Sequence, residues 1–83
     1  MSAGMASNTK TIYVELLDEG TKVARPTQGE VLGGNLYRLL PTRDYDAEDE
    51  HWEFPPGSVV RCAKEMRNGE EILIARELVP PGR

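Results

Sequence analysis

The chain has 83 residues, of which 39% are apolar and 29% charged, so it is long enough for one domain and too short for two. Its longest apolar runs fall far short of the roughly 20 residues that span a bilayer. A single cysteine, Cys62, excludes an internal disulfide and a cysteine-rich zinc site. We therefore expect a cytoplasmic protein without membrane attachment, stabilised by packing alone.

The net charge of -4 is distributed unevenly. Six of the fourteen acids fall within residues 44–53, and the rest of the chain carries ten Lys and Arg against eight Asp and Glu. The acidity thus belongs to one segment. For this reason the whole-chain charge argues only mildly against binding to nucleic acid.

The first half of the chain predicts three short strands. Residues 1–10 are small and polar without periodicity and are predicted to be a disordered tail. Apolar and polar residues alternate over 11–17, and an extended pattern resumes over 21–26 after a glycine turn, ending at Pro26 because proline lacks an N–H. After a Gly33-Gly34-Asn35 turn, residues 36–40 have the length of a third strand.

The second half predicts a long loop and a hairpin. Residues 42–56 have no clean period, although Asp44 or Asp46 is a suitable cap for one helical turn. Two β-rich segments, 57–66 and 70–78, flank an Asn-Gly pair at 68–69, which favours a type I′ hairpin turn. Residues 80–83 are predicted to be a C-terminal tail.

These elements predict an all-β fold: a small five-stranded half-open SH3-like barrel with one long acidic loop, forming a single domain over residues 11–79. A sandwich usually needs more strands. The alternative is an OB-like barrel, which would normally have longer strands and a helix between strands three and four.

Trp52 and Phe54 lie two residues apart, so in an extended segment both rings point to one side. One interpretation is that they close the open end of the barrel, because large aromatics dominate small cores. The other keeps Trp52 exposed as a docking residue beside the acidic loop. The candidate binding residues are Tyr37, Tyr45, Trp52, Phe54, Asp46 and Asp49.

Metal and thiol chemistry are weakly supported. The spacing of Asp44, Asp46 and Glu48 begins like a calcium loop but lacks the required glycine, so we expect a solvated loop and no metal or cofactor. His51 and Cys62 are the one pair suited to thiol catalysis. Cys62, however, shares a strand face with apolar neighbours and is predicted to be a buried, inert thiol, so we expect no enzyme activity.

Four arginines suggest the alternative function of nucleic-acid binding, since small barrels bind nucleic acid with basic residues on one sheet face. They are Arg25, Arg38, Arg61 and Arg76. The other interpretation is that these arginines form cross-strand ion pairs with Glu15, Glu30, Glu71 or Glu77. The acidic loop disfavours phosphate binding nearby.

An Arg-Pro pair at 25–26 and a W-x-F-x-P-G-x-x-V-x-C pattern over 52–62 resemble a group of small, uncharacterised bacterial proteins, with similarity over residues 12–78. The resemblance implies a compact all-β bacterial domain and no mechanism. From the residues we expect a non-enzymatic protein-binding or adaptor module, with another protein as its partner.

Overall fold

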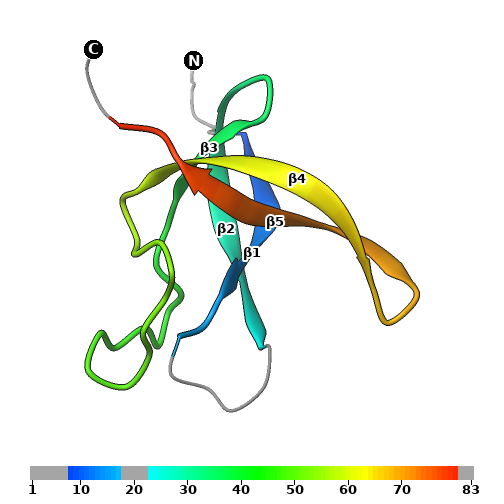
Figure 1. Cartoon of the computed structure of the whole chain (residues 1–83). Coiled ribbons are helices and arrows are strands. Elements are labelled where there is room, and N and C mark those ends of the chain that lie inside the picture. Colours follow the sequence, from blue (N-terminus) through cyan, green and yellow to red (C-terminus); the bar gives the residue numbers. More distant parts are fainter. Residues whose placement is uncertain (1–7, 18–22, 81–83) are drawn as a thin grey trace.

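The computed structural model describes residues 8–17 and 23–80, and these form an all-β structure (Figure 1). Its strands are β1 (Thr9–Glu15), β2 (Ala24–Gly33), β3 (Leu36–Leu39), β4 (Val59–Arg67) and β5 (Glu70–Leu78). Consecutive strands pair antiparallel, and β1 and β5 pair parallel to close a small barrel. The predicted all-β, five-stranded architecture is confirmed, and it is consistent with an SH3-like barrel.

The connection between β3 and β4 is the long acidic loop, without the helix that an OB-like barrel would have there. In the part of the chain that the structure describes, no helix is long and apolar enough to cross a membrane. The strands close into a barrel, and the ladder that closes it between β1 and β5 is a single residue pair, Tyr13 and Ile74.

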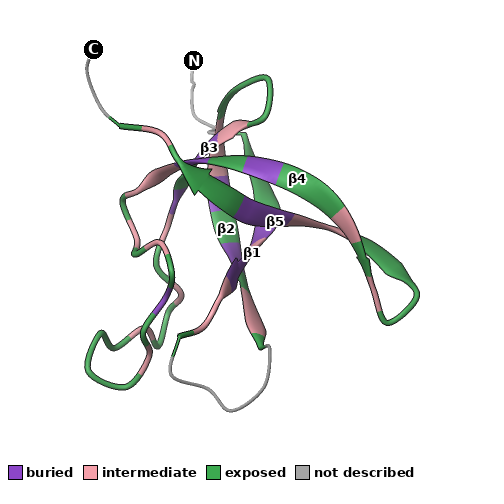
Figure 2. Ribbon diagram, viewed as in Figure 1, coloured by how far each residue is buried: buried purple, intermediate pink, exposed green. Residues whose placement is uncertain are grey.

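The core lies inside the barrel, where inward-facing positions of all five strands and the acidic loop meet (Figure 2). Its buried members are Ile12, Val14, Tyr37, Leu39, Trp52, Val60, Cys62 and Ala75. Gly29 faces the same interior, and a Cβ there would lie 2.6 Å from Cγ1 of Ile12. The packing therefore requires glycine at this point of β2.

The predicted end of the second strand at Pro26 is wrong, because β2 continues to Gly33. Pro26 lies opposite Tyr13. The N–H of Val31 donates to the C=O of Asn8 and that of Leu16 to the C=O of Val23. Since hydrogen-bonded pairs alternate with non-bonded ones, Tyr13 and Pro26 form a non-bonded pair, and the missing N–H removes no ladder bond.

The strand limits also differ at the ends of the domain. β1 begins at Thr9, two residues before the predicted start, because Thr9 and Lys10 pair with β2. The rest of the predicted N-terminal tail, apart from Asn8, lies outside the described residues, as do residues 81–83 of the predicted C-terminal tail. Val79 still donates its N–H to the C=O of Val59.

The β4–β5 hairpin has the predicted turn, since Asn68 and Gly69 both have positive φ, 52° and 81°. Further along, the consecutive residues Arg61 and Cys62 of β4 pair with Glu77 and Ala75 of β5. Arg76, between these two, has no partner on β4 and is therefore the extra residue of a β-bulge. Bulges re-aim side chains, and this one turns Arg76 toward β1.

An ion-pair cluster, which we call the seam clamp, holds β5 and β4 against β1. It consists of Glu15, Glu65, Arg67 and Arg76. Glu15 accepts hydrogen bonds from Arg67 at 3.0 Å and Arg76 at 3.2 Å, and its side chain is only 12% exposed. Arg76 also binds Glu65, which lowers the pKa of that carboxyl. The contribution of Glu65 is thus present at neutral pH and is lost as the pH falls through the lowered pKa.

Replacing Glu15→Gln should destabilise the fold by about 1–3 kcal/mol, because two guanidinium groups then lose a poorly solvated carboxylate partner. Urea unfolding measures the change. The matched control is Glu77→Gln, which breaks the exposed pair with Arg61 and should cost less than about 1 kcal/mol. Equal costs for the two variants would show that the seam clamp has no special role.

Candidate functional site

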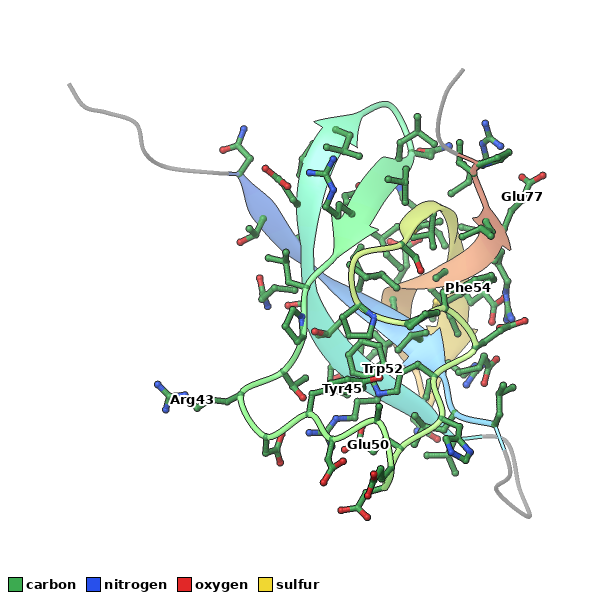
Figure 3. All side chains as sticks on the ribbon, turned by 90° about the vertical axis from the view of Figure 1, so that its left-hand side faces the viewer. Arg43, Tyr45, Glu50, Trp52, Phe54 and Glu77 are labelled. Carbon is green, nitrogen blue, oxygen red and sulfur yellow. The ribbon has the colours of Figure 1, made fainter. Side chains whose placement is uncertain are left out.

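The acidic loop closes one end of the barrel with aromatic side chains (Figure 3). Trp52 forms an isolated β-bridge with Leu16, and its ring lies edge-on to that of Tyr45 with centroids 4.9 Å apart. The indole N–H donates to Oε1 of Glu50 at 2.8 Å. Trp52 is therefore packed on its apolar faces and satisfied at its one polar atom.

The expected docking surface needs correction. Tyr37 and Trp52 are 5% and 4% exposed, and Phe54 and Tyr45 are half-buried against the core. Small barrels need these rings to fill their ends, so they cover the core instead of facing a partner. Of the six candidates, Asp46 and Asp49 alone are exposed. The barrel-closing interpretation of Trp52 agrees with the structure.

Arg25 on β2 fixes the shape of the acidic loop. Its guanidinium lies 2.7 Å from Asp44 and 3.3 Å from Glu50. A backbone hydrogen bond, a second from Thr42 and the charge of Arg25 lower the pKa of Asp44. Sequence reasoning assigned Arg25 to a sheet face, whereas the structure directs it to the loop.

The segment is the predicted loop, and it contains one hydrogen-bonded turn that begins at Asp46. Oδ1 of Asp46 accepts the N–H of Glu48, and its C=O accepts that of Glu50, both at 2.9 Å. The described residues contain no group of three or more His, Cys, Asp or Glu side chains placed to hold a metal ion.

The His51 and Cys62 side chains are not arranged as a thiol–imidazole pair. Cys62 is 4% exposed, and burial raises the pKa of its thiol to about 11. Its N–H binds the C=O of Asn35 at the β2–β3 turn, whereas the C=O of His51 binds Leu17 at the end of β1. These two connections lie at opposite ends of the barrel (Figure 1). The predicted buried thiol is confirmed.

The four candidate nucleic-acid-binding arginines are all ion-paired. Arg38 binds Glu30 at 2.7 Å, Arg61 binds Glu77 at 2.8 Å, Arg76 binds Glu15 and Glu65, and Arg25 binds the loop. The predicted pairing is confirmed for Glu15, Glu30 and Glu77. It is wrong for Glu71, which has no ion pair among the described residues.

A gap between β1 and β5 is the feature that sequence reasoning missed. The even-numbered residues of β1 hydrogen-bond to β2, as the bonds of Asn8 and Leu16 show, so the backbone groups of Thr9, Thr11 and Tyr13 point toward β5. Tyr13 alone is paired there. Within the described chain, the N–H and C=O groups of Thr9 and Thr11 have no ladder partner.

The opposite wall of the gap has the same property. In a hairpin with a two-residue turn, Arg67 and Glu70 form the hydrogen-bonded pair nearest the turn. The next residue, Glu71, therefore directs its N–H and C=O away from β4 and toward β1. No pairing of Glu71 with β1 exists. The two strands cross at a steep angle in Figure 1, and Tyr13 and Ile74 are the one ladder pair that the described residues form between them.

Two hollows line this gap, and both are bordered by Tyr13, Glu70 and Ile72. One, of about 310 Å³, lies between the β1–β2 surface and the β4–β5 hairpin and also includes Val23. The other, of about 410 Å³, includes Thr11 and Glu71. The gap thus combines free backbone groups, half-buried apolar side chains and carboxylates. No local sequence signal marks it, because it joins the first and last strands.

Comparisons with protein families, with curated proteins and with solved structures give no match for this chain. The chemistry of the site therefore follows from its own residues.

Replacing Glu50→Ala should destabilise the fold by about 1–3 kcal/mol, because the Trp52 indole N–H and Arg25 lose a largely buried partner. Trp52 fluorescence in the parent protein should be blue-shifted and shielded from iodide. The variant should show a red shift and stronger quenching. Glu53→Ala, which removes an exposed carboxylate from the same loop, is the control and should leave both properties unchanged.

Cys62 in the folded protein should resist iodoacetamide at neutral pH, with labelling rising only as urea unfolds the chain. The raised pKa means that the thiol favours folding fully below its ordinary pKa of 9.0, and that this contribution is lost as the pH rises through about 11. Rapid labelling of the folded protein would contradict the burial of the thiol.

Proposed function

We propose that the protein is a protein-binding module that accepts an extended segment of a partner as an added strand along β5, in the gap beside β1. The observation that carries the proposal is the pair of facing edges, where the backbone groups of Thr9, Thr11 and Glu71 point across the gap without a ladder partner. An extended peptide supplies the missing donors and acceptors, which is how strand addition provides affinity.

The surroundings of the edges favour this occupant. Tyr13, Ile72 and Leu73 are half-buried and border the hollows, so an added strand would cover apolar surface as well as complete a ladder. The β4–β5 hairpin also has a free edge on β4, because β3 pairs with β4 only over residues 59–61. No strand faces that outer edge of β4, whereas β1 faces the β5 edge, so a peptide in the gap can pair on both of its sides.

Nucleic-acid binding is less well supported. To bind nucleic acid, arginine side chains must neutralise phosphates and displace the counterions around them. Each candidate arginine is already bound to a carboxylate of this chain. The exposed carboxylates of the acidic loop add repulsion. These observations favour a protein partner, as the sequence led us to expect.

The proposal is tested with the probe heptapeptide Ac-TKVTVKT-NH2, titrated into ¹⁵N-labelled protein. We expect the largest amide shifts at Thr9, Thr11 and Glu71. Glu71→Pro removes the free N–H without breaking the β4–β5 ladder and should weaken binding at least about fivefold, equivalent to one net hydrogen bond. A peptide with methylated backbone nitrogens should also bind more weakly.

Met66→Pro is the matched control, because Met66 lies opposite Glu71 in a non-bonded pair and directs its N–H to the outer edge of the hairpin. It should bind the peptide like the parent. If the peptide causes no shifts in the gap, or if both proline variants weaken binding equally, strand addition at β5 is ruled out.

A further inference from the structure

The walls of the gap carry a charge imbalance. The carboxylates of Glu70 and Glu71 have no hydrogen bond or ion pair among the described residues, although those of Glu15 and Glu65 close by are held by arginines. Glu70 borders both hollows and Glu71 borders one. Lys10 is the cation on the β1 wall. Arg67 also borders the hollow under the hairpin, but it is already paired with Glu15 and Glu65. Two unpaired carboxylates therefore face one lysine where the strands diverge.

Apolar side chains lie next to these carboxylates. Ile72 and Tyr13 border both hollows, and Val23, which is 36% exposed, borders the one under the hairpin. Its volume of about 310 Å³ is at the lower end of ligand pockets, which begin at about 300 Å³. It is thus large enough for part of a peptide and too small for a folded partner.

The carboxylates and the apolar side chains together predict which residues a bound peptide has, because side chains alternate between the two faces of a strand. In a strand added to β5, the residue opposite Glu71 places its side chain beside that carboxylate, and the next residue faces the side of Ile72 and Glu70. Cationic side chains thus meet the carboxylates near the turn, and apolar ones meet Ile72 and Tyr13 further in.

We infer that the segment bound in the gap is a basic and apolar extended peptide, whose Lys or Arg residues contact Glu70 and Glu71 and whose apolar residues fill the hollow under the hairpin. The inference rests on the proposed function and specifies its partner. A second copy of this chain is disfavoured as the occupant, since antiparallel pairing of two β5 edges centred on Glu71 would place like charges opposite each other.

The test compares the lysine heptapeptide with its charge-reversed form, Ac-TEVTVET-NH2, and with a form in which alanine replaces valine. The lysine peptide should bind about tenfold more tightly than the acidic one, because the carboxylate on the face that the lysines share attracts lysine side chains and repels glutamate ones. The preference should shrink with added salt. The alanine form should bind more weakly than the lysine peptide.

The double variant Glu70→Gln/Glu71→Gln should reduce the preference to within about twofold while still binding the lysine peptide, because the backbone groups remain. Asp49→Asn with Glu48→Gln removes two charges from the acidic loop and should leave the preference intact. Equal binding of the lysine and acidic peptides would overturn the inference and leave strand addition standing.

Absence of binding by any of the peptides would overturn both proposals. Light scattering of the free protein tests whether a second copy of the chain occupies the gap. If the mass doubles with concentration while the amides of Thr9, Thr11 and Glu71 become protected, a second copy occupies the gap, and the assignment of a basic peptide is wrong.

Discussion

The closure of the barrel between its first and last strands is the constraint on which the rest of the structure depends. β1 and β5 share one ladder pair, Tyr13 and Ile74, because the two strands cross at a steep angle. The backbone therefore cannot hold the seam alone, and a cluster of charged side chains takes over part of that task. The same divergence leaves edges without ladder partners, so the short closing ladder and the binding site that we propose have one origin.

The opposite problem, an open barrel end, is solved by the long loop. Arg25 binds Asp44 and Glu50, and Glu50 in turn satisfies the indole of Trp52. Two acids of the segment are thus used to position an aromatic plug, and the others remain in solvent. A stretch that looks functional for its composition thus supplies part of the core, while the binding site that we propose lies at the sheet edges near the hairpin.

The features predictable from sequence are those fixed by neighbours in the chain. The Asn68-Gly69 turn and β5 follow from local turn chemistry, and the inert Cys62 follows from strand alternation. The passage of β2 through Pro26 was not predictable, because it depends on which edge of β1 bonds to β2. The gap depends on the angle at which β1 and β5 cross, and these strands are distant in sequence, so no local pattern records it.

The pairing of the first strand with the last also constrains the order of folding. Glu15 and Arg76 are separated by 61 positions, whereas β4 and β5 are joined by a two-residue turn. Local hairpins form quickly and distant contacts slowly, since closing a long loop costs chain entropy before any contact repays it. On a ribosome, β1 must wait with one edge uncovered until the final strand has emerged. For that interval β2 covers one edge of β1, and the other edge is open to pairing with any extended chain nearby.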